Sequence, residues 1–263
     1  MARRSVQSVE RVAALLEALG RAGRPLAVRE LSAQVRLPRP TVYRLMQTLA
    51  ACGLVAAAEG GHVLGPRILS LAAQRLEQIE LRTAGHSRLR ALRDQTGETV
   101  HLAVLEQGQV VYIDKVESSG PLRMASAVGK IMPAHSTALG KAMLAFMPPA
   151  VARHVLRDHG LPRRTANTIT DPARFFEELA GIQARGFAID NIENEEGIRC
   201  VAAPIFDHRA QVAGAVSLSG AASSITLDRA RRELGPLVRR AALDISRALG
   251  WTEARVSEEA RVP

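Results

Sequence analysis

The sequence predicts a two-domain α+β protein, with a small helical N-terminal domain and a larger domain built on an antiparallel sheet. Three observations lead to this prediction. The length of 263 residues exceeds the usual size of one domain. Apolar residues follow helical spacing over residues 6–92, whereas paired strand-like segments begin near Glu98. The composition, 47% hydrophobic and 23% charged, is typical of a folded globular protein and excludes a disordered chain.

Residues 1–66 are predicted to form a winged helix-turn-helix domain. Apolar residues recur at helical spacing in 6–19, 28–35 and 41–52, and the second of these segments is too short to stand alone. Two short apolar segments flank Glu59-Gly60-Gly61, which indicates a compact hairpin. Three helices followed by a hairpin are the pattern of a helix-turn-helix with a wing.

The N-terminal half of the third predicted helix is expected to contact DNA, because the helix-turn-helix geometry projects this end into the major groove. Arginine reaches guanine edges, whereas arginine, threonine and tyrosine all suit phosphates. Two glycines allow the wing tip to approach the DNA backbone closely. The residues expected at the DNA are Arg39, Thr41, Tyr43, Arg44, Gly60 and Gly61.

The distribution of charge favours DNA as the partner. Thirty-five basic and 26 acidic residues give a net charge of +9, and residues 1–67 carry ten arginines and four glutamates, a net +6. Such a concentration suits a polyanion. Tyr43 is the one aromatic residue of this segment, which argues against a stacking platform for single strands. The alternative is a three-helix protein-interaction domain whose arginines only solvate its surface.

Residues 67–95 are predicted to form a linker helix. The helical segment 68–92 follows Pro66, and its first part carries an apolar stripe that needs a partner. A helix-turn-helix commonly reads two half-sites as a dimer. We therefore expect the linker helix to pack against its symmetry mate in a homodimer.

Residues 96–251 are predicted to form an antiparallel α+β domain, and the polar residues 252–263 a frayed tail. Turn signals join the predicted strands into two hairpins with additional short strands. The strands are expected at 100–105, 110–115, 122–128, 187–190, 198–206 and 211–219. The helices are expected at 137–146, 150–159, 172–185 and 227–249.

Polar residues of the second domain indicate a pocket for a small anion that carries hydroxyl groups. Ser136 or Thr137 caps a helix that begins at Ala138, and the free backbone N–H groups there suit a carboxylate. Ser-x-Ser on a strand places both hydroxyls on one face. The expected polar residues are Asp190, Cys200, Ser217 and Ser219. The alternatives are a simple helix cap, a half-exposed strand face and a buried cysteine that acts as a small hydrophobe.

The sequence predicts no catalytic residue, metal or cofactor. Cys200 with His135, or Ser217 with His101, combines a nucleophile with a base. However, the nucleophile elbow, the His-x-x-x-His pattern, the phosphate loop and the dinucleotide fingerprint are all missing. Two distant cysteines fit neither a disulfide framework nor a cysteine-based zinc site. Two other functions stay open for this chain: a small-molecule-processing enzyme domain tethered to DNA, and a purely structural dimerisation module.

Localisation in the cytoplasm without a membrane partner is expected. The longest small or apolar run covers residues 49–58, well below the length of a membrane span. Glu10 and Glu17 interrupt the first apolar stretch, so a signal peptide is not indicated.

Three segments of the chain resemble the IclR family of transcriptional regulators, in the right order and over about Ser5–Trp251. The run LAVRELSAQVRLPRPTVYRLMQTLAACGLV resembles the DNA-binding domain of that family. The run VYIDKVESSGPLRMASAVGKIMPAHSTALGKAMLA resembles the start of its effector-binding domain. The most specific segment, GFAIDNIENEEGIRCVAAPIFD, matches the signature stretch of the family.

The resemblance implies a GAF/PAS-like effector-binding domain and a homodimer, often a dimer of dimers, on near-palindromic operator DNA. It implies control of a catabolic operon by a small metabolite, through repression or activation. The ligand carboxylate is expected at the backbone amides of Ala138 and Leu139, although the glyoxylate-sensing branch has a glycine where this chain has Ala138. The PAHSTALGKA pattern favours a keto acid or a sugar-derived acid over an aromatic acid. The remaining pocket positions implied are Asp190, Cys200, Ser217 and Ser219, with Leu122, Met124 and Ile198 as apolar wall.

Overall fold

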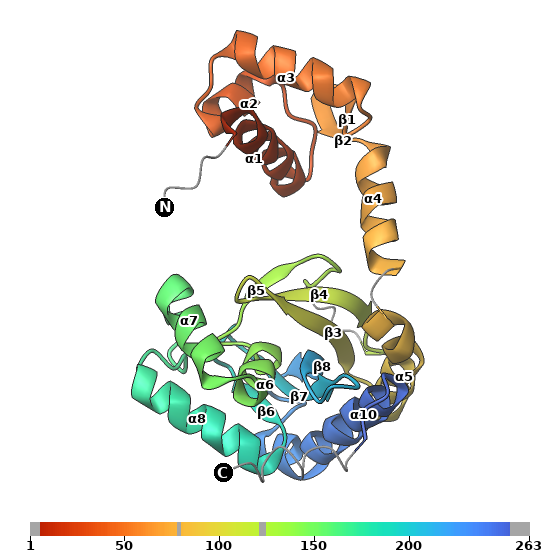
Figure 1. Cartoon of the computed structure of the whole chain (residues 1–263), viewed down its shortest axis with the longest axis vertical. Coiled ribbons are helices and arrows are strands. Elements are labelled where there is room, and N and C mark those ends of the chain that lie inside the picture. Colours follow the sequence, from red (N-terminus) through yellow and green to blue (C-terminus); the bar gives the residue numbers. More distant parts are fainter. Residues whose placement is uncertain (1–5, 78–79, 121–124, 253–263) are drawn as a thin grey trace. The chain divides into compact units, whose positions relative to one another are not determined.

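The computed structural model describes residues 6–77, 80–120 and 125–252. The chain divides into two compact units, residues 1–78 and 79–263 (Figure 1). The N-terminal unit contains α1 (Gln7–Ala22), α2 (Val28–Val35), α3 (Arg39–Ala51), β1 (Val55–Ala58), β2 (Gly61–Leu64) and α4 (Pro66–Glu77). Three helices followed by an antiparallel hairpin confirm the predicted winged helix-turn-helix.

The core of the N-terminal unit forms where the apolar faces of α1, α2 and α3 meet. Leu15, Leu31 and Val42, one from each helix, are fully buried in it. Gly23 adopts a left-handed conformation with φ 61° and ends α1. Since these helices bury their apolar residues together, their polar residues lie on the outer surface.

The C-terminal unit is a six-stranded antiparallel sheet with helices, in the strand order β5-β4-β3-β8-β7-β6. Its strands are β3 (Thr99–Glu106), β4 (Gln109–Val116), β5 (Ile131–Pro133), β6 (Ala188–Asn191), β7 (Ile198–Phe206) and β8 (Val212–Ala221). Its helices are α5 (Glu80–Thr96), α6 (Ala138–Phe146), α7 (Pro149–His159), α8 (Pro172–Arg185), α9 (Leu227–Arg229), the π-helical segment η1 (Ala230–Leu234) and α10 (Gly235–Ala248). The predicted α+β class is confirmed.

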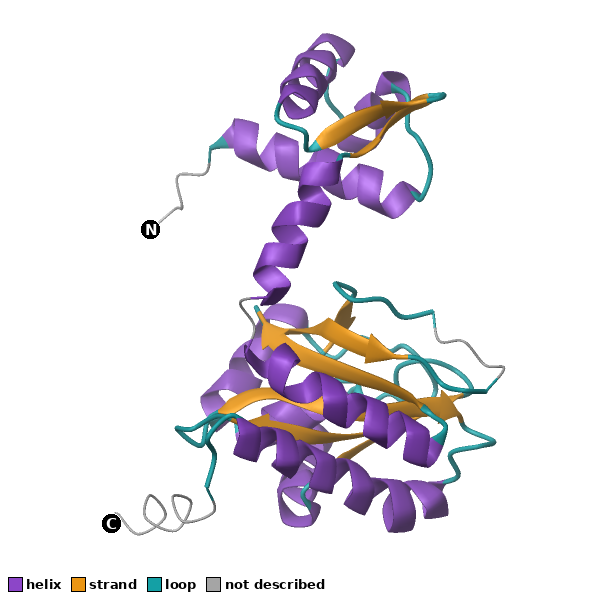
Figure 2. Cartoon of the chain, turned by 90° about the vertical axis from the view of Figure 1, so that its right-hand side faces the viewer, coloured by secondary structure: helices purple, strands orange, loops and turns teal. Residues whose placement is uncertain are grey.

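Helices cover both faces of this sheet (Figures 1 and 2). Helices α5 and α10 pack on one face, and α6, backed by α8, packs on the other. Ala215 of β8 belongs to the apolar cluster on the α6 side. Because side chains alternate along a strand, Ser217 and Ser219 also face α6, while Val216 and Leu218 face α5 and α10.

The segment predicted as one linker helix, residues 67–95, contains parts of two described helices, α4 and α5. Leu81, Leu89 and Leu92 of α5 are buried, and α5 packs on β3 and α10. A side chain at Gly85 would lie 2.9 Å from Leu102 of β3, so glycine allows close contact there. This packing makes α5 part of the C-terminal unit.

Two other predicted elements differ from the structure. The predicted strand 122–128 is wrong over residues 125–128, which form a bend and a turn; residues 121–124 lie outside the described residues. Gly129 has φ 85° and donates its N–H to the Tyr112 carbonyl. Because the chain turns here, strand pairing with β4 begins only at β5. Of the predicted frayed tail, residues 253–263 lie outside the described residues.

The predicted single helix 227–249 is also wrong, because it contains the π-helical segment η1 between α9 and α10. Pro236 lies in the first turn of α10. Proline has no N–H to donate to the preceding turn, and its ring crowds the carbonyl four residues earlier. A wider π turn relieves this conflict without ending the helical segment.

Candidate functional site

The turn between α2 and α3 fixes the direction of the exposed α3 helix. Arg36 adopts a left-handed conformation with φ 53°. The Ser32 hydroxyl donates to the Leu37 carbonyl at 2.6 Å, and the Leu37 N–H donates to the Ser32 carbonyl at 3.2 Å. Val42 and Met46 bury one face of α3. The opposite face is therefore available to a partner.

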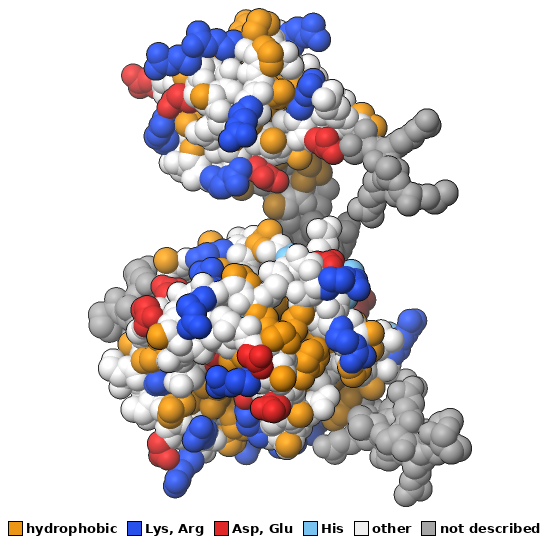
Figure 3. Space-filling view, turned by 90° about the vertical axis from the view of Figure 1, so that its left-hand side faces the viewer, with side chains coloured by type: hydrophobic (Ala, Val, Ile, Leu, Met, Phe, Trp, Pro, Cys, Tyr) orange, Lys and Arg blue, Asp and Glu red, His pale blue; other side chains and the backbone are white. Residues whose placement is uncertain are grey.

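Most of the residues predicted at the DNA lie on exposed surface. Arg39, Tyr43 and Arg44 are exposed and Thr41 is half-buried. Neither arginine forms an ion pair within the described part of the chain. The same face continues to Gln47, which the sequence reasoning missed although it follows Tyr43 by one helical turn. Figure 3 shows basic side chains distributed over one face of this unit.

The two glycines of the wing differ in why the structure has glycine there. Gly60 has φ 85° in the turn of the hairpin, and a Cβ atom at this position would meet no described atom within 4 Å. A side chain at Gly61 would lie 2.4 Å from the Leu26 backbone, where Leu26 and His62 form an isolated antiparallel bridge. Gly61 is thus required by packing within the domain, whereas Gly60 leaves the wing tip open.

A cavity of about 40 Å³ lies in the C-terminal unit between the α6 face of the sheet and the N-terminal end of α6. It brings together seven of the nine residues predicted at the effector: Ala138, Leu139, Asp190, Ile198, Cys200, Ser217 and Ser219. Met124 and Leu122 lie outside the described residues. The volume accommodates little more than a water molecule or two, so a larger ligand requires the cavity to expand.

Antiparallel register explains why residues distant in sequence meet there. Cys200 of β7 pairs with Ser219 of β8 on one side and with Asp190 of β6 on the other. Ser217 of β8 pairs with His101 of β3. Paired residues project to the same face of a sheet, so four strands contribute to one wall of the cavity.

The N-terminal end of α6 faces the cavity with unused backbone donors. Thr137 caps the helix by accepting a hydrogen bond from the Gly140 N–H at 3.2 Å. The first N–H groups of a helix have no acceptor within it, and Ala138 and Leu139 occupy these positions. The helix dipole adds partial positive charge there. This end of α6 is therefore suited to a carboxylate.

Asp190 is almost fully buried beside the cavity. Its carboxylate accepts hydrogen bonds from the N–H groups of Glu193, at 2.7 Å, and Asn194, at 3.3 Å. Burial and the neighbouring Glu193 carboxylate raise the pKa of Asp190 to about 7. Asp190 therefore holds a proton for a large part of the time at neutral pH.

This raised pKa predicts that binding of a carboxylate ligand weakens as the pH rises through about 7. An anion in the cavity favours the protonated Asp190, so ligand affinity is full below this pKa and falls by up to about tenfold per pH unit above it. Calorimetric titration with pyruvate and gluconate between pH 6 and 8.5 measures the slope. Asp190→Asn, which stays neutral, is expected to remove the slope; an equal slope in that variant contradicts the prediction.

His101 and Tyr112 complete the polar wall, and the sequence reasoning placed neither in the ligand site. Their rings stack with centroids 4.7 Å apart, and His101 hydrogen-bonds with Ser126 at 2.7 Å. Ser217 Oγ is buried and has no hydrogen-bond partner among the described residues. His101 could have been identified from the alternation of side chains along β3. This alternation places His101 on the same face of the sheet as Ser217 and Ser219.

The residues considered for nucleophilic catalysis are poorly suited to it. Burial lowers the pKa of His101 to about 3, so it is a weak base at neutral pH. Burial also raises the pKa of the Cys200 thiol, which keeps it protonated and unreactive. His135 hydrogen-bonds the Pro162 carbonyl at 3.0 Å and does not line the cavity.

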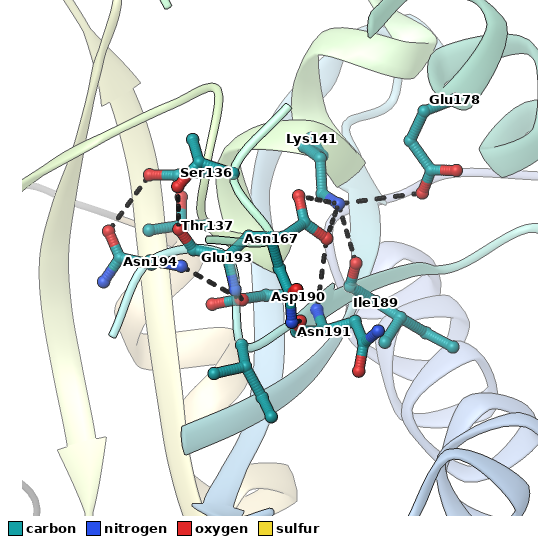
Figure 4. A network of polar contacts seen from close by, with 12 residues as sticks. Ser136, Thr137, Lys141, Asn167, Glu178, Ile189, Asp190, Asn191, Glu193 and Asn194 are labelled. Carbon is teal, nitrogen blue, oxygen red and sulfur yellow. Dashed lines mark hydrogen bonds and ion pairs between the residues drawn. The ribbon is translucent and has the colours of Figure 1, made fainter. Parts of the chain in front are cut away.

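Behind the cavity, a buried lysine joins α6 to the loop between β6 and β7 (Figure 4). Lys141 Nζ lies 2.6 and 2.7 Å from the two Glu193 carboxylate oxygens and donates to the Ile189 carbonyl at 2.7 Å. Glu178 of α8 lies 3.7 Å away. Glu193 Oε1 also accepts the Asn191 N–H at 3.1 Å. The sequence reasoning missed the Lys141–Glu193 pair. A lysine within the apolar run ALGKAMLAF could have indicated a buried charge that needs a partner.

The Lys141–Glu193 pair holds the loop that carries the cavity residues. Asp190 bonds to the Glu193 and Asn194 N–H groups, and Asn194 accepts a hydrogen bond from Ser136 at 3.1 Å. The N-terminal end of α6 and Asp190 are thereby fixed relative to each other. The described residues contain no group of three or more His, Cys, Asp or Glu side chains that could hold a metal ion.

Comparison with known families accounts for both units. Residues 8–58 match the IclR helix-turn-helix domain, and residues 73–247 match the domain described as bacterial transcriptional regulator IclR C-terminal. The second match alone covers more than half of the chain. The chain belongs to the IclR family of transcriptional regulators. The predicted DNA-binding regulator is thus confirmed, and because the family consists of regulators, the enzyme alternative is not supported.

Individual relatives extend over nearly the whole chain. The HTH-type transcriptional regulator KdgR of Escherichia coli is 34% identical over 250 residues, 94% of both chains. The acetate operon repressor of Salmonella typhimurium is 35% identical over 251 residues, 94% of this chain and 91% of its own. The crystal structure of the Thermotoga maritima IclR has 33% identity and a TM-score of 0.75, covering 93% of this chain and 98% of that one.

None of the described helices is both long enough and apolar enough to cross a membrane.

Proposed function

We propose that this IclR-family regulator senses a small organic acid in the cavity at the α6 N-terminus and thereby controls a catabolic operon. One observation carries the proposal. The N-terminal N–H groups of α6 at Ala138 and Leu139, the buried Asp190 and the Ser217 hydroxyl, which has no hydrogen-bond partner among the described residues, all border the same cavity. Anion-binding donors at one end and hydroxyl-binding groups at the other match a small hydroxylated or keto acid.

The chemistry of the wall favours a keto acid or a sugar-derived acid. Ser217, Ser219 and Asp190 border the cavity and offer hydrogen bonds to hydroxyl or carbonyl oxygens. The relative named as an acetate operon repressor supports an operon for small carboxylic acids. An aromatic acid is the alternative outcome of a ligand screen.

Control of DNA binding requires that the ligand distinguish two states of the regulator. Because a ligand larger than the cavity must expand it, binding shifts the packing around the α6 N-terminus and the loop fixed by Lys141. The helix-turn-helix fold supports a homodimer on a near-palindromic operator, because many such domains read two half-sites as a dimer. Leu69 and Leu71 of α4 are exposed. These apolar side chains support a contact of α4 with another subunit, in a dimer or a dimer of dimers.

Selection of bound duplexes from a random DNA pool tests the proposal. The selection is run at about 0.15 M salt, where non-specific phosphate binding is weakened, with and without pyruvate and gluconate. Enrichment of an inverted repeat whose recovery changes with one of the acids is expected. Recovery of no sequence under any condition, with protein that is folded and dimeric, contradicts it.

Arg44→Ala is expected to weaken binding to the selected operator by about 1–3 kcal/mol, if the exposed guanidinium reads a base edge. Binding to random DNA should change much less. Arg21→Ala is the matched control, because Arg21 is exposed on α1 and paired with Glu17 at 3.6 Å. Equal losses on operator and random DNA would assign Arg44 to a phosphate instead, as measured by fluorescence anisotropy with both duplexes.

A further inference from the structure

A second and much larger cavity lies at the other end of β7. Its volume is about 530 Å³, within the range of small-molecule sites. It is bordered by the ends of α6 and α8, by the end of β7 and by α10. Cys200, in the first cavity, and Phe206, in this one, are six residues apart on β7, roughly 20 Å along an extended strand. The two cavities are therefore separate.

Aromatic side chains form the wall of this second cavity. Phe206 contacts Phe146 edge to face, with ring centroids 5.6 Å apart. Phe206 also stacks with Trp251, with centroids 6.0 Å apart. Leu243 of α10 adds an aliphatic surface. Such a wall suits the apolar body of a ligand.

Polar groups in the same lining select the charge of the ligand. Arg239 of α10 is exposed at this cavity and is the one charged residue in its described lining. It forms no ion pair or hydrogen bond within the described part of the chain. The Trp251 indole N–H is buried and has no acceptor among the described residues. Both groups are donors, and no carboxylate of the described residues borders the cavity.

The Arg239 side chain passes close to the end of α8. Gly186 ends α8 in a left-handed conformation with φ 81°. A side chain at Gly186 would lie 2.7 Å from Arg239 Nε and 2.9 Å from its Cδ. The absence of a side chain at Gly186 thus lets the arginine stem cross the helix end beside the aromatic wall.

We propose that this second cavity binds an amphipathic organic anion, a monocarboxylate with an alkyl or aryl body. The carboxylate meets the Arg239 guanidinium, and the apolar body lies against Phe146, Phe206 and Trp251. Arginine and carboxylate form charge-assisted hydrogen bonds, and the aromatic wall excludes water from one side of them. The proposal is independent of the acid-sensing function of the first cavity.

Trp251 gives a direct measurement, because it is the one tryptophan of the chain and forms part of the wall. Hexanoate, titrated into the full-length protein, is expected to change the tryptophan fluorescence in a saturable manner. Its neutral analogue hexanamide should bind more weakly. Calorimetry with the same two probes gives affinity and stoichiometry independently of fluorescence.

Arg239→Gln is the decisive variant. It is expected to raise the Kd for hexanoate about tenfold, the effect of losing one charge-assisted contact, while the Kd for hexanamide stays the same. Arg240→Gln, which changes the exposed neighbour outside the lining, should bind like the unmodified protein. Asp190→Asn should also leave hexanoate binding unchanged, which separates this site from the first cavity.

Two results overturn the proposal. The first is a hexanoate Kd that is the same in Arg239→Gln and the unmodified protein, or a titration that does not saturate. The second is hexanoate binding that occurs only in a chain ending at Thr252, because residues 253–263 would then be the occupant. Melting curves of all variants verify that each one is folded.

Discussion

Lys141→Met is expected to destabilise the C-terminal unit by about 3–5 kcal/mol, the usual cost of removing one member of a buried ion pair. Lys141 is fully buried and contacts both carboxylate oxygens of Glu193. Without the lysine, Glu193 remains in the interior as an uncompensated charge, and the Ile189 carbonyl loses its donor. Urea unfolding followed by the fluorescence of Trp251, which lies in this unit, measures the loss.

The pH dependence of this variant identifies the cause. An unpaired buried carboxylate has a raised pKa, so Lys141→Met should regain stability as the pH falls from 7 to 5 and Glu193 takes up a proton. Lys141→Met with Glu193→Gln removes the charge and should recover most of the stability at pH 7. A variant as stable as the unmodified protein, or a double variant that is less stable than Lys141→Met, contradicts this account of the pair.

Asp190→Ala and Ser219→Ala are expected to abolish the response to the effector while operator binding without effector stays within about twofold of the unmodified protein. Both residues border the first cavity and lie in a different compact unit from α3. Removal of Asp190 also takes away the acceptor of the Glu193 and Asn194 N–H groups, which loosens the loop beside α6.

Operator binding of the two variants is measured with increasing concentrations of the acid found in the selection experiment. In the proposed site, Asp190 both contacts the ligand and accepts hydrogen bonds from the N–H groups of the loop. Asp190→Asn retains an acceptor for these N–H groups, so it should leave the loop conformation unchanged and alter only the ligand affinity. Ser224→Ala, a serine bonded to Glu98 outside the cavity, is the control. Unchanged effector titrations in both alanine variants would remove the ligand from this cavity.

The local elements and the broad composition of the first site were predictable from the sequence. Helical spacing in α1 to α3 and the glycine-containing turn of β1 and β2 depend on residues close together in the chain. Ser217 and Ser219 follow from the alternation of side chains along one strand. Asp190 and Cys200 follow from their places at the end of one predicted strand and the start of the next, and the IclR signature stretch implies the same residues. The antiparallel register brings all four to one cavity.

Features that depend on contacts between distant segments required the tertiary structure. His101 joins the site because β3 pairs with β8, and Lys141 is buried because Glu193 lies opposite it across 52 residues of sequence. A bend and a turn before Gly129 occupy residues 125–128, which were predicted as strand, and the π segment before Pro236 replaces part of a predicted helix. In each case, a long-range pairing or a backbone clash outweighed local propensity.

Composition, periodicity and the family motifs determined the class of protein, its two units and most of its candidate ligand contacts, since these depend on residue type and short-range spacing. The tertiary structure alone decided the protonation of Asp190, the unpaired state of Arg239 and Ser217 among the described residues, and the existence of the second cavity. The physical reason is that desolvation and empty volume are set by which chain segments surround a group, and those segments are far apart in the sequence.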